Sequence, residues 1–413
     1  MNNSIYGTQE PKHKKKIINA TLSKLYKKLV FRQLKKLKNN CIELNYNNKS
    51  YLFGDTCNKN RVLISIHDYK FFQLLVFKGH LGFAESYGKG YFSTPKLTDL
   101  LTLFAQNFAI VDKAEGGLSW FFNRLQYLYY KYYEKNSLHG SKENIHAHYD
   151  LGNDLFETFL DLNMQYSSAL YTSDDFTLEE AQIAKLESIC NRLKLTSNDH
   201  VLEIGSGWGG LAIFMAKNIG CKVTTITISE EQFKYANSRI AREKLGSLID
   251  IKICDYREVK GKYDKIVSIE MIEAVGEQYY QTYFNKCAEL LKPSGLFLMQ
   301  AILIADHEYN KAKNSVDFIK SYIFPGSNIP SLNRLNTAAN QAFMCLVSYL
   351  DMTNDYAKTL YDWQTRFKNQ SEKLLKLGYD KYFQNIWNFY FSYCQAGFLV
   401  GHIRDAHLVY KKR

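Results

Sequence analysis

The stretch VLEIGSGWGG, residues 201–210, decides the fold of this chain of 413 residues. An apolar run typical of a buried strand leads into a cluster of glycines, and a helical pattern begins where the cluster ends. Glycine is needed where a turn is tight and where the backbone must come close to a ligand. The stretch therefore predicts a strand, a tight turn and a helix that together hold a nucleotide-like ligand.

Strand-like and helix-like segments alternate on both sides of this turn. Such alternation predicts a mainly parallel sheet with helices on both faces, which is an α/β fold of the Rossmann type. From about residue 305 the chain becomes helical and aromatic, and we expect this part to cap the site. We expect strands at 200–204, 222–228, 249–254, 263–269 and 295–301, and a helix at 178–193.

The N-terminal part of the chain has a different pattern. Short runs that resemble strands, YLF at 51–53, RVLISI at 61–66 and FFQLLVF at 71–77, alternate with turns. A helix is expected near residues 97–106. We interpret this part as a smaller α/β domain.

A segment dense in aromatic residues, WFFNRLQYLYYKYYEKN at 120–136, follows this domain. Its rings are suited to an acyl channel or a lipid interface, but an aromatic core helix accounts for them equally well. A polar turn at 139–142 is interpreted as a linker. We therefore expect an N-terminal, lipid-binding domain at 1–140 and a second domain at 141–413.

The composition is that of an ordinary globular protein, with 46% apolar residues and 5 prolines. The chain contains no apolar run of the roughly 20 residues that a membrane span needs, and no signal-peptide pattern follows Met1. Its 8 cysteines are scattered, without the spacing of a metal site. We therefore expect a cytoplasmic protein with reduced thiols and no metal.

Most of the formal net charge of +12 lies near the N-terminus, where residues 1–50 hold twelve Lys or Arg and two acids. From Lys12 to Lys38 the basic residues are mixed with leucines at helical spacings, as in a helix that lies on an anionic membrane. A helix docked on the protein with a solvated lysine face is the alternative. Nucleic acid is a less favoured partner, because no recognisable reader module follows. A homodimer is compatible with the sequence.

The glycine turn alone does not identify its ligand. GSGWGG also fits the dinucleotide pattern GxGxxG, and Glu230 is an acid at the spacing expected for NAD. The neighbouring strand ends are more informative, because the carboxyl ends of parallel strands meet at the edge where ligands bind. Their polar side chains suit a cationic adenosine better than a pyrophosphate and favour S-adenosylmethionine. These residues are Glu203, Thr227, Gln232, Asp255 and Tyr256.

Six motifs in order resemble the cyclopropane fatty-acid synthase family, over a region from about Gly82 to the C-terminus. The resemblance implies the class I methyltransferase fold and transfer of a methyl group from S-adenosylmethionine to a cis double bond of a phospholipid acyl chain. It also implies a peripheral position at the inner face of the membrane. The motifs are HYDLGNDLFETFLDLNMQYSSALY (148–171), LEEAQIAKL (178–186), VLEIGSGWGG, TISEEQ (227–232), VSIEMIEAVG (267–276) and YIFPG (322–326).

The resemblance also implies roles for matching residues. Tyr166 and Ser167 correspond to cofactor contacts, and Cys394 to a cysteine near the acyl site. A bicarbonate ion serves the family as the base, and the positions that match its site are counted here as catalytic or anion-binding. The implied cofactor cradle is Gly205, Gly207, Thr227, Gln232, Asp255 and Tyr256, and the implied bicarbonate site is Ser168, Glu273, Gln300, Tyr356 and the backbone near Ile302.

The chain departs from the family pattern at the bicarbonate site. The pattern has Cys at the position of Ser168, His at that of Gln300, and Glu-His where this chain has Glu273–Ala274. Ser and Gln still donate hydrogen bonds, so an anion can be held. No imidazole remains there to titrate near neutral pH.

We expect the alkene to attack the methyl group in a site without water, and aromatic rings to stabilise the resulting carbocation. Loss of a proton from the new methyl group would then close a cyclopropane. Loss of a neighbouring chain proton would instead leave a methyl or methylene branch. Two other classes remain open: a small-molecule methyltransferase, and a non-catalytic membrane-associated protein that keeps the fold.

Overall fold

The computed structural model describes residues 12–38, 40–56, 61–107 and 151–413. The chain divides into two compact units, Met1–Arg124 and Leu125–Arg413. The predicted domain boundary, the aromatic segment at 120–136 and the linker at 139–142 lie outside the described residues.

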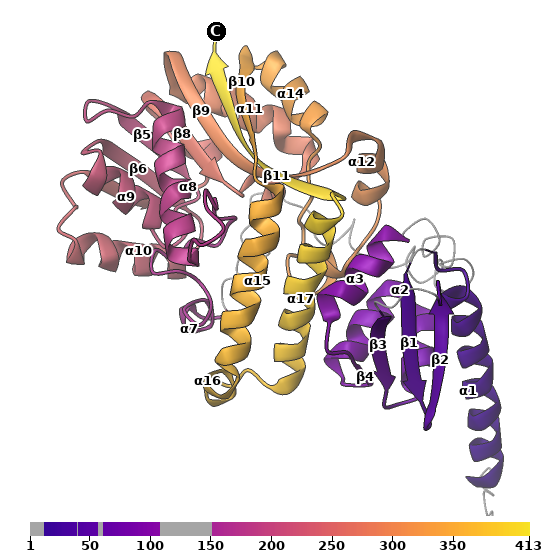
Figure 1. The fold of residues 1–413 in the computed structure, drawn as a ribbon. Coiled ribbons are helices and arrows are strands. Elements are labelled where there is room, and N and C mark those ends of the chain that lie inside the picture. Colours follow the sequence, from indigo (N-terminus) through magenta and orange to yellow (C-terminus); the bar gives the residue numbers. More distant parts are fainter. Residues whose placement is uncertain (1–11, 39, 57–60, 108–150) are drawn as a thin grey trace, which may run out of the picture. The chain divides into compact units, whose positions relative to one another are not determined.

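The N-terminal unit is a small α/β unit, as predicted (Figure 1). Its sheet has the order β2-β1-β3-β4, in which β1 runs antiparallel to β2 and parallel to β3. Its elements are α1 (Lys12–Leu34), β1 (Cys41–Tyr46), β2 (Lys49–Gly54), β3 (Arg61–Ile66), α2 (Lys70–Gly88), β4 (Phe92–Ser93) and α3 (Leu97–Gln106).

The strand predicted at 71–77 is wrong, because FFQLLVF lies in helix α2. Short apolar runs are ambiguous in sequence, since buried helices and buried strands share them. Phe71 and Phe72 are buried in this unit, and edge-to-face ring contacts join Phe72 to Phe31 of α1 and to Tyr46 of β1. The helix predicted near 97–106 is confirmed as α3.

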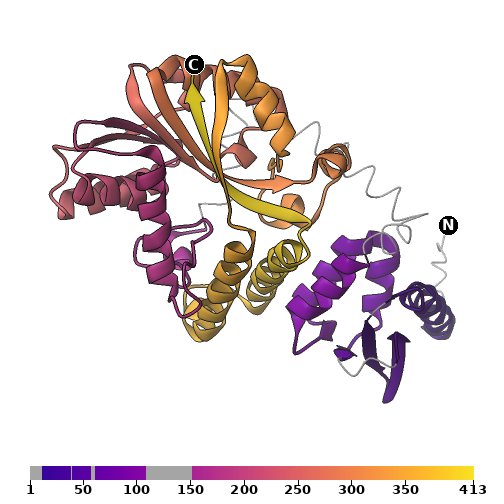
Figure 2. The same cartoon turned by 45° about the horizontal axis from the view of Figure 1, so that its top comes forward.

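The C-terminal unit is built on a seven-stranded sheet of order β10-β11-β9-β8-β5-β6-β7 (Figure 2). Strands β5 to β9 are parallel, whereas β11 runs antiparallel to both β9 and β10. The five predicted strands and the helix at 178–193 are confirmed. The strands are β5 (His200–Ile204), β6 (Lys222–Thr227), β7 (Ile249–Ile253), β8 (Tyr263–Ile269), β9 (Leu291–Ile304), β10 (Met344–Asp351) and β11 (Ile403–Lys412).

Helices cover both faces of this sheet, because alternate strand residues point to opposite sides. Val201 and Val267 pack with α8, α9 and α10, whereas Leu202 and Ile266 pack with α11 and α14. Helix α8 begins at a capping box in which Thr177 and Glu180 bond each other's backbone N–H. The helices are α7 (Asn153–Phe156), α8 (Leu178–Leu193), α9 (Gly210–Asn218), α10 (Glu230–Arg242), α11 (Tyr280–Leu290) and α14 (Leu332–Gln341), with short 3-10 turns at Tyr256–Glu258, Ile272–Ala274 and Glu277–Tyr279.

The part after residue 305 is mostly helical, as predicted, and α15 and α17 lie side by side at one end of the sheet in Figures 1 and 2. The prediction missed β10 and β11, which add two strands to the sheet. The sequence of β11 does not have the apolar pattern of a buried strand, because Asp405 and His407 are polar yet fully buried. The helices are α12 (Asp306–Lys313), α13 (Phe318–Tyr322), α15 (Thr353–Asn369), α16 (Ser371–Lys376) and α17 (Lys381–Leu399).

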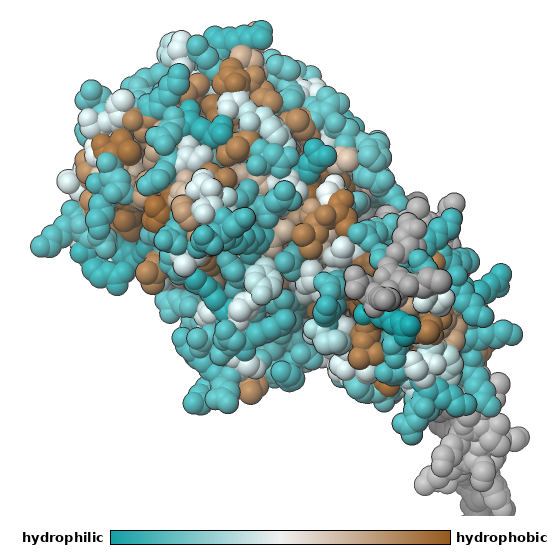
Figure 3. All heavy atoms as spheres, in the orientation of Figure 1, coloured by the Kyte–Doolittle hydropathy of each residue, from teal (hydrophilic) through white to brown (hydrophobic). Residues whose placement is uncertain are grey.

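The face drawn in Figure 3 is mainly hydrophilic, with hydrophobic residues in small groups. Among the described residues, no helix combines the length and the apolar character that crossing a bilayer requires.

Candidate active site

The glycine turn lies where the order of the parallel strands reverses. Strand β5 has β6 on one side and β8 on the other. The chain therefore adds β6 and β7 to one side of β5 and then crosses over to add β8 and β9 to the other side. Open α/β sheets bind ligands at this switch point, outside the carboxyl ends of the strands. The turn after β5 is therefore placed where the sequence predicted a ligand.

The four glycines of the turn have different tasks. Gly205 and Gly207 have φ values of +95° and +48°, and a Cβ at Gly207 would meet nothing within 4 Å. A Cβ at Gly209 would come within 3.0 Å of Ala236, and one at Gly210 within 2.2 Å of the Asn163 carbonyl oxygen. Gly207 thus faces open space, whereas Gly209 and Gly210 permit close packing.

The end of β6 presents a short polar network. Thr227 Oγ1 donates to Gln232 Oε1 at 3.0 Å and accepts from the backbone N–H of Ser229 at 3.1 Å. Ser229 caps α10 by accepting from the backbone N–H of Gln232. Thr227 at the end of β6 and Gln232 in the first turn of α10 are therefore fixed against each other at the strand end.

The end of β7 carries the predicted pair Asp255–Tyr256. The Asp255 carboxylate accepts two hydrogen bonds from the Arg257 guanidinium, at 2.8 and 2.6 Å. Tyr256 is buried, and its hydroxyl group has no hydrogen-bond partner among the described residues. Burial raises the pKa of Tyr256 to about 12, so the hydroxyl group stays neutral. Buried hydroxyl groups in folded proteins normally have a polar partner, and a bound ligand would supply one for Tyr256.

Glu203 lies at the end of β5 and is fully buried. It accepts a hydrogen bond from Thr225 Oγ1 of β6. Burial raises the pKa of Glu203 to about 8. Its carboxyl group already bonds to the neighbouring strand. A ligand at this strand end would therefore have to form a second hydrogen bond with the same carboxyl group.

The loop before α8 brings Tyr166 and Ser167 to the site. The two hydroxyl groups of Tyr166 and Tyr390 lie 3.0 Å apart. Ser167 Oγ accepts from the ammonium group of Lys185 at 2.7 Å. Lys185 is fully buried on α8, and burial lowers its pKa to about 8, although Asp161, Glu270 and Asp405 favour the charged form.

Glu270, which follows β8, was not predicted as a site residue. Its carboxylate accepts from the backbone N–H of Ser168 at 2.8 Å and from Gln300 Nε2 at 2.8 Å. The Tyr356 hydroxyl group, from α15, donates to the other oxygen at 2.7 Å. Three of the residues expected to hold a bicarbonate ion therefore hold the carboxylate of Glu270. An acid three residues before Glu273 in VSIEMIEAVG was the available signal.

Glu273 lies beside this carboxylate. Its Oε1 accepts from the backbone N–H of Ile302 at 2.6 Å, and its Oε2 is buried with no hydrogen-bond partner among the described residues. Burial, together with the charge of Glu270, raises the pKa of Glu273 to about 8.

Gln300 joins the acids to β11. Its Nε2 donates to Asp405 Oδ2 at 2.9 Å as well as to Glu270, and its Oε1 lies 3.2 Å from His407 Nε2. Burial raises the pKa of Asp405 well above its usual range and lowers that of His407 to about 3. A neutral His407 that donates to Oε1 would orient the Gln300 amide so that its NH₂ group faces the two acids.

The Ser168 side chain is not directed at the acids, because its hydroxyl group donates to the Ala169 carbonyl oxygen at 2.9 Å. Its backbone N–H makes the contact instead. Cys394 is half-buried on α17, and burial raises the pKa of its thiol well above the ordinary value. A neutral thiol suits an apolar lining better than a proton acceptor.

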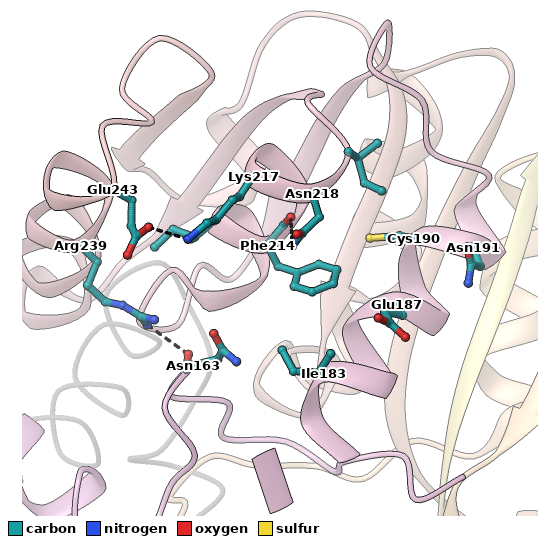
Figure 4. Close-up of a pocket in the computed structure, with 12 residues that line it drawn as sticks. Asn163, Ile183, Glu187, Cys190, Asn191, Phe214, Lys217, Asn218, Arg239 and Glu243 are labelled. Carbon is teal, nitrogen blue, oxygen red and sulfur yellow. Dashed lines mark hydrogen bonds and ion pairs between the residues drawn. The ribbon is translucent and has the colours of Figure 1, made fainter. Parts of the chain in front are cut away.

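A separate hollow of about 640 Å³ lies between α8, α9 and α10. Figure 4 shows Lys217 paired with Glu243, and Arg239 reaching the Asn163 carbonyl oxygen beside them. None of the predicted site residues lines this hollow. It is therefore distinct from the candidate active site.

The predicted cofactor residues fit S-adenosylmethionine. Open space faces Gly207, and the unpaired Tyr256 hydroxyl group is available to a ligand. A separate bicarbonate ion does not fit the predicted anion site in the same way. Its donors are taken by two carboxyl groups of the chain: Glu270 accepts from Ser168, Gln300 and Tyr356, and Glu273 from Ile302.

A sheet of this order, with its glycine turn at the switch point and polar side chains at the neighbouring strand ends, together with the comparisons that follow, defines the class: the chain is an S-adenosylmethionine-dependent methyltransferase. Its family follows from residues 136–408, which match the model described as mycolic acid cyclopropane synthetase (CMAS). The chain belongs to that family.

Relatives and solved structures agree with this assignment. The chain is 35% identical over 333 residues to the tuberculostearic acid methyltransferase UfaA1 of Mycobacterium tuberculosis, covering 79% of this chain and 77% of the relative. It is 38% identical over 266 residues to the cyclopropane-fatty-acyl-phospholipid synthase of Escherichia coli K12, covering 64% and 66%. The mycolic acid cyclopropane synthase CmaA1 complexed with SAH and CTAB superimposes with a TM-score of 0.62 at 26% identity, covering 66% of this chain and 98% of that one. The chain thus belongs to a family of S-adenosylmethionine-dependent fatty-acid methyltransferases and cyclopropane synthases.

Proposed function

We propose that this enzyme transfers a methyl group to the cis double bond of an unsaturated acyl chain in a phospholipid and closes a cyclopropane ring. The observation that carries the proposal is a cluster of acids at the carboxyl edge of the sheet, in which half-buried Glu270 and Glu273 lie near fully buried Asp405 and among aromatic rings. An apolar chain requires such an enclosed site, and a carbocation requires a base beside it.

Aromatic side chains surround the acids. The Tyr356 ring is stacked on that of Phe398, with centroids 4.5 Å apart, and the rings of Tyr166 and Trp363 lie 5.3 Å apart. When bound, S-adenosylmethionine would supply an electrophilic methyl group. The chain's own residues would exclude water, present ring faces to the cationic carbon and accept the proton.

Electron balance limits the products. Methyl transfer followed by loss of one proton adds CH₂ to the acyl chain, which gives a cyclopropane, a methylene branch or a methyl branch on a remaining double bond. A saturated methyl branch needs a further hydride and proton from a reductant. The methylene branch is the second candidate, because the longest-matching of the relatives described above is named a methyltransferase and not a cyclopropane synthase.

We propose that the enzyme works at the surface of a phospholipid membrane, on the cytoplasmic side. Helix α1 packs on the N-terminal unit through buried Val30, yet Leu22, Leu25 and Leu29 keep 38%, 49% and 41% of their surface exposed. These leucines recur at helical spacing beside exposed Lys24, and together they would supply the apolar and the cationic contacts with an anionic membrane. Co-sedimentation with anionic vesicles, lost on Leu25→Glu, would support this; equal binding to neutral vesicles would contradict it.

The test of the reaction is expression in a bacterium that lacks such an enzyme, followed by analysis of its phospholipid acyl chains. A gain of one CH₂ with the high-field NMR signals of a cyclopropane supports the first candidate. Olefinic CH₂ signals would support the methylene branch. Unchanged lipids from a protein that binds S-adenosylmethionine would overturn the lipid proposal.

A further inference from the structure

The carboxylate of Glu270 occupies the position where a free anion was expected. Its three donors, the Ser168 backbone N–H, Gln300 and Tyr356, all lie at 2.7–2.8 Å. We propose, building on the proposed function, that Glu270 is the proton acceptor of this enzyme, and that the reaction therefore proceeds without bicarbonate.

The backbone at Glu270 supports the assignment independently. Glu270 has a φ of +44°, in the left-handed region that side chains other than glycine rarely adopt. Such a conformation costs energy and persists where the surroundings hold it in place. Here its backbone N–H bonds the Gln300 carbonyl oxygen at 2.9 Å, while its side chain reaches three donors. The unfavourable backbone conformation thus occurs at the residue whose carboxylate fills the anion site.

The charges around Glu270 make it the acid that ionises most readily in the cluster. Burial raises its pKa to about 7, and the donors together with the charge of Lys185 oppose a larger rise. Glu273 and Asp405, which lack three donors each, are raised to about 8 and well above the usual range. A base whose pKa lies near the working pH is the most effective one.

The proton transfer balances without another reactant. A C–H bond of the newly added methyl group breaks, and its electron pair forms the ring bond to the cationic carbon. The proton goes to the Glu270 carboxylate, which becomes a carboxylic acid and later returns the proton to water. A bicarbonate ion would accept the same proton. The Glu270 carboxylate can therefore take its place as the base in this step.

The first test uses the unmodified full chain. Turnover on vesicles of unsaturated phosphatidylethanolamine and phosphatidylglycerol is measured in buffer stripped of carbon dioxide and again with added bicarbonate. We expect equal rates, and ¹³C NMR should show no binding of labelled bicarbonate to the protein. A rate that depends on bicarbonate, or saturable binding of the labelled ion, would overturn the inference.

The second test uses two variants. Glu270→Gly removes the carboxylate and suits the positive φ, so we expect turnover to fall by about a hundredfold or more and to recover partly with bicarbonate or formate. Glu270→Gln fills the same space, so we expect an equal loss without recovery. Full activity of Glu270→Gln would overturn the inference.

Two control measurements separate the causes of failure. Affinity for S-adenosylmethionine and the thermal midpoint should stay close to those of the unmodified protein in both variants. If the unmodified chain modifies no lipid, the proposed reaction is wrong, but the NMR comparison of the unmodified chain with Glu270→Gly still decides whether Glu270 occupies the anion site. Labelled bicarbonate binding to Glu270→Gly alone would support that occupancy, and binding to both or to neither would contradict it.

Discussion

The carboxyl edge of the large sheet has two halves that are built in opposite ways. The ends of β5, β6 and β7, which we call the cofactor half, present an open glycine turn with short polar side chains. The edge around the ends of β8 and β9, the acid half, presents half-buried Glu270 and Glu273 with fully buried Asp405 of β11, held by donors from the loop before α8, from β9 and from α15. One half is shaped by backbone conformation and the other by a network of side chains.

Because of this difference, the two halves should be sensitive to different kinds of substitution. Backbone that approaches a ligand must stay free of side-chain atoms, so the cofactor half should fail when volume is added. A buried polar network fails when one partner is removed, because the remaining groups lose their hydrogen bonds. Adding volume to one half and deleting single donors from the other therefore test the comparison directly.

The largest effect is expected from Gly207→Val. Its Cβ would enter the open space beside the turn, and the φ of +48° disfavours any side chain. We expect the dissociation constant for S-adenosylmethionine, measured by calorimetry, to rise at least about a hundredfold, or about 2.8 kcal/mol.

Gly246→Val is the matched control, because Gly246 also faces open space but has no positive φ. It should leave the affinity unchanged. A change of less than about fivefold (roughly 1 kcal/mol) in Gly207→Val would show that the turn does not hold the cofactor.

The next effect is expected from Tyr356→Phe in the acid half. The lost hydroxyl group lowers the pKa of Glu270, so its removal should raise that pKa. Because the base acts when ionised, the acid limb of the pH–rate profile should move to higher pH, with turnover at pH 7 reduced about tenfold or more. Rates are best compared below pH 8, where Lys185 keeps its charge.

Tyr349→Phe serves as the control, since Tyr349 is exposed on β10. Its profile should match that of the unmodified enzyme. An unshifted acid limb in Tyr356→Phe would show that the Tyr356 hydroxyl group does not affect the pKa of the base. That result would contradict a connected hydrogen-bond network in the acid half.

The sequence predicted the cofactor half better than the acid half, for a physical reason. Glycines, strand ends and the helix start are local signals, so the turn and all five parallel strands could be placed. Glu270 lies within a quoted motif, but its partners come from the loop before α8, from β9 and from α15. Only the folded chain brings those donors together. The buried polar residues of β11 made that strand hard to predict for a similar reason, because the donor to the Asp405 carboxyl group, Gln300, comes from β9.

A smaller effect is expected from Glu203→Gln in the cofactor half. Burial raises the pKa of Glu203 in the folded state to about 8, whereas an unfolded glutamate titrates near 4.5. The folded state therefore binds the proton more tightly, and the contribution of Glu203 to stability is lost as the pH rises from about 4.5 to about 8. Urea unfolding should show a decline of at most about 1.4 kcal/mol per pH unit in the unmodified protein, and a shallower one in the variant. Identical slopes would mean that Glu203 does not stay protonated in the folded protein.

The smallest effect is expected from Lys217→Ala at the hollow between α8, α9 and α10. Lys217 and Glu243 form an exposed ion pair, and such pairs contribute little because water screens them. The free energy of unfolding should change by less than about 0.5 kcal/mol, with turnover and cofactor affinity unchanged. The hollow lies apart from the carboxyl edge, which holds the acids and the glycine turn. A marked loss of turnover in Lys217→Ala would therefore place part of the chemistry outside that edge and break the division of the site into two halves.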